Sequence, residues 1–263
     1  MAQGYAVANS NTGHDNGSEP YASFAFANFA YRAVHVTANA SETLVKAYYG
    51  KPQRYMYWQG CSQGGRQGMM EAQRFPDDFD GIAVAAPVFS YERLNIEDLW
   101  SLQLLMKNHF ASNLAYDVSG DGTYKSLTKL EMLHKAVLDK CDAKDGIKDG
   151  IVSDPENCDF NPDVDLVDKM CPSDKNADAC FTKTQVGTIK KLYGPHDSKS
   201  VRIFNGLAYG SEFSWPENVI PYGGNNLTPS HLIYEVDHVN FLFFEHSPGV
   251  APPNTKDLSF SPG

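Results

Sequence analysis

The 263-residue chain is long enough for one large domain or two smaller ones with buried cores. Its formal net charge of −10 would repel phosphate backbones, and no apolar run approaches the roughly 18 residues that a membrane helix needs. We therefore expect a globular protein that binds neither nucleic acid nor membrane. The oligomeric state does not follow from the sequence.

The first 90 residues alternate between strand and helix patterns. The elements expected in chain order are a strand at 4–9, a helix at about 26–49, a strand at 54–59, a tight turn at 60–65, a helix at about 66–75 and a strand at 79–86. Gly50 and Pro52 end the first of these helices, and Pro76 ends the second. This alternation is typical of a parallel α/β sheet.

The pattern changes after this region. Helices are expected near 92–108, 128–140 and 182–193, and the stretches between them are polar and contain cysteines. We interpret residues 1–90 as a partial α/β core and residues 91–263 as an inserted or appended domain that resembles a lid.

Four cysteines lie close together in the second region, at Cys141, Cys158, Cys171 and Cys180. Three pairings are open, and two local bridges, Cys141 with Cys158 and Cys171 with Cys180, are the simplest; each would stabilise by roughly 3 kcal/mol. The alternative is four free thiols in a cytosolic protein. The first residues carry neither the basic nor the apolar segment of a signal peptide, so either an export signal precedes them or the protein is intracellular.

Residues 60–64 match the pattern G-x-S-x-G between a predicted strand and a predicted helix. In this context the motif forms a strained turn that holds the serine hydroxyl clear of the sheet, and the helix N-terminus favours a developing negative charge. We therefore predict that Ser62 is a nucleophile and that the backbone N–H of Gln63 is an oxyanion donor. The alternative is a glycine-rich turn that only begins a helix.

A nucleophilic serine needs a general base and an orienting carboxylate, which follow it in chain order in α/β hydrolases. No downstream histidine follows a clear hydrophobic strand; the candidates are His109, His134, His196, His231, His238 and His246. The pairs Asp237-His238 and Glu245-His246 are the least unsuitable. His14 precedes the serine, so its chain order is wrong for the base, although it could line the site.

Residues 141–151 (CDAKDGIKDGI) contain three aspartates interleaved with glycines, which let the backbone curl. Hard cations such as calcium prefer several oxygen ligands. The donors of such a site would be the carboxylates of Asp142, Asp145 and Asp149 and the backbone carbonyls of Ile147 and Ile151. The spacing is not that of an EF-hand, so a cation site and a solvated acidic turn both remain open.

Six segments together resemble one known family. They are residues 12–15 (TGHD), 29–35 (FAYRAVH), 57–68 (YWQGCSQGGRQG), 71–76 (EAQRFP), 79–82 (FDGI) and 141–151 (CDAKDGIKDGI). In these long segments the chain is similar to the fungal and bacterial tannase and feruloyl esterase family. The resemblance spans most of the chain and fades after about Ser214.

The resemblance implies an α/β-hydrolase fold with a lid, and Ser62 as the nucleophile. It also implies that Cys61 bridges to a cysteine beside the catalytic histidine. Calcium would bind in the lid to the ligands that the family's loop implies: Asp142, Asp145, Ile147, Asp149 and Ile151. The implied activity is hydrolysis of small aromatic esters, feruloyl or galloyl, from plant cell walls or tannins, by a secreted enzyme.

The sequence also departs from the family. Family members are longer on both sides, and this chain has no later aspartate at a strand end and no His-Cys pair. We therefore interpret it as a central fragment, with part of the sheet and most of the lid, that has little or no activity by itself. The rival interpretations are a non-catalytic calcium-binding relic and an enzyme whose missing residues come from a partner.

Overall fold

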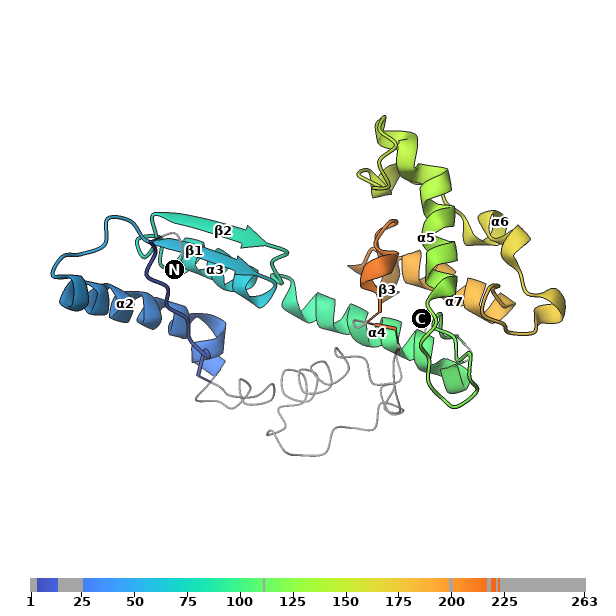
Figure 1. Ribbon diagram of the computed structural model, residues 1–263, viewed down its shortest axis with the longest axis horizontal. Helices are drawn as coiled ribbons and strands as arrows, with labels where there is room; N and C mark the ends of the chain where they lie inside the picture. The colour runs from blue at the N-terminus through green and yellow to red at the C-terminus, as the bar shows by residue number, and fades with distance from the viewer. Residues whose placement is uncertain are drawn as a thin grey trace. The chain divides into compact units, whose positions relative to one another are not determined.

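The computed structural model describes residues 4–13, 26–110, 112–198, 201–216, 219–220 and 222, with 107–110 described by their backbone alone. Contacts among them divide the chain into two compact units, with the boundary between Glu92 and Arg93 (Figure 1). The assignment of these regions to a hydrolase core and a lid stays a prediction.

Two short parallel strands and the helix between them form the centre of the first unit (Figure 1). β1 (Tyr57–Cys61) and β2 (Gly81–Ala85) pair residue by residue over their whole length, and α3 (Gln63–Arg74) connects them. The Asp80 carboxylate accepts a hydrogen bond from the N–H of Met56 at 2.7 Å, which extends the pairing just before β1 begins. The predicted parallel strand–helix–strand unit is therefore confirmed.

The strand expected at residues 4–9 is wrong. Residues 5–11 have no regular structure, and none of the described strands pairs with them. A short alternation of small side chains is a weak strand signal, because strand preference depends mainly on packing against neighbouring strands. The helix expected from about residue 66 begins earlier, at Gln63, directly after the serine turn.

The helix expected at 26–49 is present, but its hydrogen-bonding pattern changes along its length. Residues Asn28–Arg32 form a π-helix (η2), and α2 (Ala33–Tyr49) continues from it. Gly50 ends α2 with φ of 71°, a left-handed conformation that glycine adopts without strain. Single-turn π segments are rare and occur often at functional sites, and hydrophobic periodicity does not distinguish them from α-helix.

Helices also build the second unit (Figure 1). α4 (Tyr91–Phe110), whose first two residues still belong to the first unit, α5 (Thr128–Cys141) and α7 (Lys183–Tyr193) each lie within two residues of the predicted bounds. The shorter elements are η3 (Asp142–Asp145), η4 (Pro155–Asn157), α6 (Pro162–Asp165), η5 (Val167–Lys169), η6 (Pro172–Asp174), the antiparallel strands β3 (His196–Ser198) and β4 (Val201–Phe204), and η7 (Glu212–Ser214). Among the helices that the structure describes, none is long and apolar enough to cross a membrane.

A single cluster of apolar side chains forms the core of the second unit. Members that are at most 2% exposed include Leu105, Leu114, Leu130, Leu133, Phe181, Ile189, Leu192 and Trp215. Complete burial of a side chain of this size stabilises the fold by roughly 1.5–3 kcal/mol. This unit therefore holds itself together by ordinary hydrophobic burial.

Two disulfides close loops around this core. Cys141 pairs with Cys158 and Cys171 with Cys180, over sequence separations of 17 and 9 residues. The simplest of the three possible pairings is therefore confirmed, and the alternative of four free thiols is wrong. Cys61, beside the predicted nucleophile, is exposed and unpaired.

Candidate functional site

Ser62 occupies a sharp turn between the end of β1 and the first residue of α3. Its φ of 57° and ψ of −116° are rare for a residue other than glycine, so the backbone is strained there. The residue is exposed. This is the conformation and exposure expected for a serine held out at the end of a sheet, as the G-x-S-x-G interpretation requires.

Backbone hydrogen bonds on both sides hold the strained turn. The N–H of Ser62 donates to the carbonyl of Ala85 at 3.0 Å, which continues the pairing of β1 with β2. The carbonyl of Ser62 accepts from the N–H of Arg66 at 3.0 Å, the first turn of α3. The serine is therefore fixed between a strand and a helix rather than carried on a free loop.

Three glycines let α3 approach the strands closely. A Cβ at Gly60 would lie 2.3 Å from the carbonyl oxygen of Gly64, one at Gly65 would lie 2.5 Å from the carbonyl oxygen of Ala85, and one at Gly68 would meet the indole of Trp58 at 2.6 Å. Real Cβ atoms essentially never lie this close to a non-bonded atom, so these positions favour glycine strongly. Gly64, by contrast, has open space around its missing Cβ.

Gln63 is the first residue of α3, so its N–H belongs to the helix N-terminus, where backbone donors have no partner within the helix. Its side-chain amide is held at both ends. Nε2 donates to the hydroxyl of Tyr91 at 3.0 Å, and Oε1 accepts from Nε of Arg66 at 2.7 Å. The predicted nucleophile and the predicted oxyanion donor thus lie next to each other on a rigid junction.

No histidine hydrogen-bonds to Ser62 among the residues whose side chains the structure describes. His134 Nδ1 lies 2.6 Å from Oε2 of the fully buried Glu212, and His196 Nε2 lies 3.2 Å from the carbonyl of Lys191, so both have structural partners in the second unit. The remaining candidates, His14, the side chain of His109, His231, Asp237-His238 and Glu245-His246, lie outside what the structure describes.

A buried acid, Glu71, lies on α3, and sequence reasoning missed it. Glu71 is 1% exposed, and burial, followed by the nearby carboxylate of Asp78, raises its pKa to about 7. Asp78 also binds Nδ1 of His35 at 2.6 Å, and the ring of His35 stacks on Phe75 at 4.0 Å. The network joins α2, α3 and the turn after α3.

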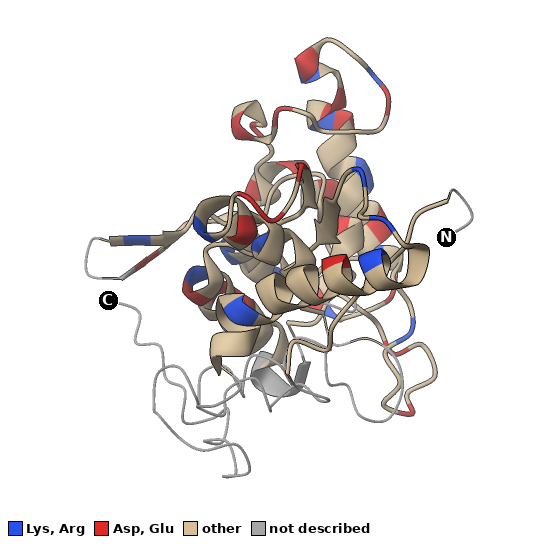
Figure 2. Ribbon diagram, turned by 90° about the vertical axis from the view of Figure 1, so that its left-hand side faces the viewer, with Lys and Arg blue, Asp and Glu red and all other residues tan. Residues whose placement is uncertain are grey.

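The acidic loop after α5 is organised around Asp142. This side chain is 5% exposed, and its Oδ1 accepts hydrogen bonds from the N–H groups of Asp149 and Gly150 at 3.1 and 3.0 Å. Figure 2 shows acidic residues recurring along this part of the chain, at the top of the view. Asp142 thus fixes the course of the loop backbone at Asp149 and Gly150.

Two Asp-Gly-Ile turns follow one another in the loop. Asp145 Oδ1 accepts from the N–H of Ile147 at 2.9 Å, and Asp149 Oδ1 accepts from the N–H of Ile151 at 3.1 Å. The hydrogen bond from Ile147 is the main reason why the pKa of Asp145 lies below its ordinary value. Among the described residues, no three His, Cys, Asp or Glu side chains converge as a metal site. The calcium ligands therefore remain a prediction.

The chain is similar to known proteins over most of its length. The model of the family described as tannase and feruloyl esterase matches residues 1–228. A probable feruloyl esterase B-2 from Aspergillus flavus is 35% identical over 217 residues, which is 80% of this chain and 38% of that protein. Among solved structures, an esterase from Aspergillus oryzae matches with a TM-score of 0.68 and 26% identity, over 95% of this chain and 45% of that one.

The chain thus spans less than half the length of these relatives. A crystal structure of feruloyl esterase B from Aspergillus oryzae, at 24% identity and a TM-score of 0.70, supports the same fold over 92% of this chain. The family model covers well over half of the chain, and it includes both the serine turn and the acidic loop. The chain belongs to the tannase and feruloyl esterase family.

Proposed function

We propose that the chain is part of a carboxylic ester hydrolase that forms an acyl-enzyme on Ser62. The observation that carries the proposal is the strained turn at Ser62, with φ of 57° and ψ of −116°, between a parallel strand and a helix N-terminus. Strain of this kind is kept where the surrounding structure enforces it and is typical of nucleophile turns. Relatives that carry the name feruloyl esterase support the same reaction.

The reaction would proceed in two steps. The Ser62 Oγ attacks the ester carbonyl carbon while a base takes the hydroxyl proton, and the alcohol leaves with that proton. The N–H of Gln63 donates to the developing oxyanion, where the helix dipole also favours negative charge. Water then cleaves the acyl-enzyme and releases the acid. The base and its carboxylate would come from parts of the protein beyond the described residues.

The substrates proposed are small aromatic esters, feruloyl or galloyl, such as those of plant cell walls and tannins. The names of the relatives support this class, because they include feruloyl esterases and a tannin acyl hydrolase from Aspergillus niger. Secretion is part of the same proposal. Two disulfides support it, since such bonds persist mainly in oxidising compartments.

The acidic loop is proposed to bind calcium. The ligands would be the carboxylates of Asp142, Asp145 and Asp149 with the carbonyls of Ile147 and Ile151, all hard oxygen donors of the kind that calcium prefers. The exposed isoleucine side chains, at 62% and 59%, are compatible with carbonyls that face the loop interior. Bound calcium would stiffen the loop that the disulfide between Cys141 and Cys158 closes.

Ester hydrolysis by the full-length gene product tests the enzymatic proposal. Methyl ferulate and methyl gallate are compared as substrates, and a fluorophosphonate is used to label the nucleophile, with Ser62→Ala as the matched control. We expect hydrolysis of at least one ester and a single adduct on Ser62, both absent in the variant. Hydrolysis that survives in Ser62→Ala, or an inert full-length protein, would contradict the proposal.

Calcium binding is tested by thermal unfolding and titration calorimetry, with and without a chelator. Calcium at 100 times its dissociation constant should stabilise the protein by about 2.7 kcal/mol. Asp145→Asn keeps the acceptor for the N–H of Ile147 but removes a charge, so we expect weaker binding. The control is Asp139→Asn, an exposed partner of Lys135 on α5, which should bind calcium like the parent protein. Equal behaviour of the two variants would contradict the ligand set.

A further inference from the structure

Arg66, in the first turn of α3, has contacts that the reaction described above does not use. The residue is half-buried, and its guanidinium donates hydrogen bonds to three residues that the structure describes. Nε donates to Gln63 Oε1 at 2.7 Å, Nη1 to the carbonyl of Ala30 at 3.1 Å, and Nη2 to the carbonyl of Phe29 at 2.8 Å. One side chain thus ties the start of α3 to the π-helix η2.

Aromatic rings flank the same guanidinium. Its central carbon lies 4.6 Å from the ring centroid of Phe29 and 5.9 Å from that of Tyr91. The two rings are themselves 6.2 Å apart. A planar, delocalised group with a fixed fork of donors can contact both rings and bond three acceptors at once, and a lysine ammonium cannot reproduce that arrangement.

Gln63 connects Arg66 with Tyr91. Its Oε1 faces Arg66, and its Nε2 donates to the Tyr91 hydroxyl at 3.0 Å, so both ends of the amide are fixed. The backbone N–H of the same residue is the proposed oxyanion donor. A small displacement of such a donor costs much of its contribution, because it must point at the oxyanion position before charge develops.

We propose that Arg66 is a positioning residue for the oxyanion donor: it locks the Gln63 side chain against Tyr91 and thereby holds the Gln63 N–H. This inference rests on the proposed esterase function. In this role the side chain of Arg66 touches neither the substrate nor the hydroxyl of Ser62. Its removal affects the tetrahedral state more than the binding of substrate or product.

The test uses the full-length protein with Arg66→Ala, Arg66→Lys and Tyr91→Phe. Arg74→Ala is the matched control, because Arg74 lies on the same helix and stacks on Tyr31 at 3.8 Å, away from Gln63. We expect Arg66→Ala and Arg66→Lys to lower kcat by about 30-fold with KM within about twofold. Tyr91→Phe should lower kcat by about threefold to tenfold. Arg74→Ala should match the parent protein.

A second readout separates positioning from a packing role. An aryl boronic acid mimics the tetrahedral oxyanion, whereas ferulic acid reports ordinary binding. Arg66→Ala should weaken binding of the boronic acid by about the same factor by which it lowers kcat, and it should leave binding of ferulic acid unchanged. Arg66→Ala combined with Gln63→Ala, which keeps the backbone N–H, should be no slower than Arg66→Ala alone, because both act through one contact.

Three results would overturn the inference. The first is a kcat of both Arg66 variants within twofold of that of the parent protein. The second is an equal loss of affinity for the boronic acid and for ferulic acid. The third is a double variant whose kcat falls by the product of the losses from the Arg66 and Gln63 substitutions. If neither Arg66 variant folds, the unchanged kcat of a folded Tyr91→Phe variant overturns it, and a selective loss of kcat supports it. A parent protein that neither hydrolyses esters nor takes a phosphonate label instead contradicts the proposed function itself.

Discussion

In the first unit backbone segments approach one another closely around Ser62, whereas large apolar side chains form the core of the second unit and two disulfides close its loops. Gly60, Gly65 and Gly68 leave no room for a Cβ, and no member of the apolar cluster lies before Leu105 among the described residues. The comparison teaches where each unit tolerates change. The serine turn of the first unit depends on the exact course of the backbone, and the apolar core of the second unit depends on side-chain volume and on polar anchors.

The largest effect is expected at Gly60. A methyl group there would lie 2.3 Å from the carbonyl oxygen of Gly64, so Gly60→Ala must displace the serine turn. We expect a loss of more than about 3 kcal/mol in stability or a turn that no longer presents Ser62. Thermal unfolding and phosphonate labelling of the full-length protein measure both.

Gly64→Ala is the control for this prediction, although it changes the other glycine of the same motif. Open space surrounds its missing Cβ, and alanine favours a helix over glycine by roughly 1 kcal/mol. Stability should therefore stay equal or rise. If Gly64→Ala destabilises as strongly as Gly60→Ala, the glycines serve a purpose other than close packing.

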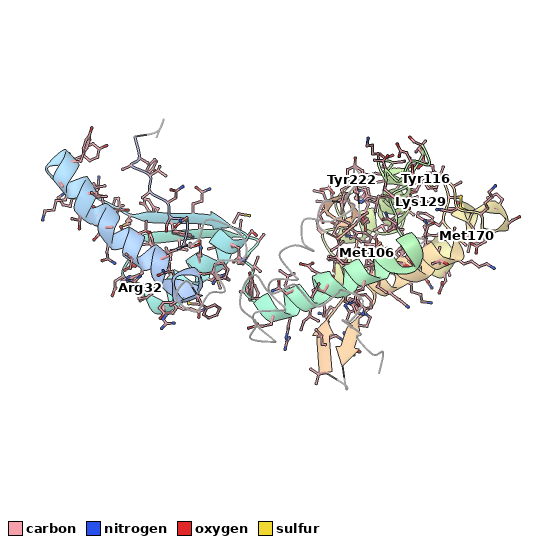
Figure 3. All side chains as sticks on the ribbon, turned by 90° about the horizontal axis from the view of Figure 1, so that it is seen from below. Arg32, Met106, Tyr116, Lys129, Met170 and Tyr222 are labelled. Carbon is pink, nitrogen blue, oxygen red and sulfur yellow. A yellow bond between two sulfur atoms is a disulfide. The ribbon has the colours of Figure 1, made fainter. Side chains whose placement is uncertain are left out.

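In the second unit we expect a large effect at Lys129, which is fully buried on α5. Its Nζ donates to the carbonyls of Ala177 and Cys180 and lies 5.5 Å from the ring of Tyr116 (Figure 3). Burial lowers its pKa to about 8. Lys129→Met should cost about 2–3 kcal/mol, because it leaves the Cys180 carbonyl without its donor inside the fold.

Lys135→Met on the same helix is the control. Lys135 is 72% exposed and pairs with Asp139 four residues away, so its loss should change stability by less than about 0.5 kcal/mol. Chemical denaturation of both variants gives the difference. Equal denaturation midpoints of the two variants would mean that the hydrogen bonds from Lys129 do not stabilise the loop closed by Cys171 and Cys180.

The sequence was sufficient for features that depend on local pattern. The parallel strands around G-x-S-x-G, the helices of the second unit and the two disulfides follow from periodicity, turn residues and loop length. The sequence was insufficient where residues distant along the chain determine the local structure. The strand expected at 4–9 has no described neighbour, and the π-helix at Asn28–Arg32 has the same periodicity as an α-helix.

The polar interior of both units was equally hidden from sequence reasoning. Lys129 lies on the apolar side of α5, where hydrophobic periodicity predicts a residue such as leucine. Its hydrogen-bond partners are about 50 residues further along the sequence. Arg66 reaches carbonyls of Phe29 and Ala30, and backbone acceptors leave no trace in a sequence. Such contacts are set by tertiary structure, so only coordinates reveal them.

Burial of Glu71 makes the stability of the first unit depend on pH. Its pKa is about 7 in the fold and about 4.5 in the unfolded chain. Between these values the folded state keeps a proton that the unfolded state loses, so stability falls as pH rises from about 4.5 to about 7. The difference between these two pKa values corresponds to about 3 kcal/mol.

Glu71→Gln removes this titration and keeps a neutral donor toward Asp78. Unfolding measured from pH 4.5 to 8 should therefore show a flatter dependence than in the parent protein. His35→Gln is the companion variant, because His35 binds the same Asp78 at 2.6 Å but leaves Glu71 in place. A parent slope that persists unchanged in Glu71→Gln would assign the pH dependence to another group.

The smallest changes in stability are expected at the N-termini of two helices, α7 and α3. Thr182 caps α7 with a complete capping box to Gln185, whereas Ser62 precedes α3 without any side-chain cap. Thr182→Ala should thus cost about 1 kcal/mol and leave ester hydrolysis unchanged. Ser62→Ala should abolish hydrolysis and alter stability by less than about 0.5 kcal/mol. The Ser62 hydroxyl does not cap α3, so it is available for the proposed reaction. A marked loss of stability in Ser62→Ala would mean instead that the hydroxyl stabilises the fold.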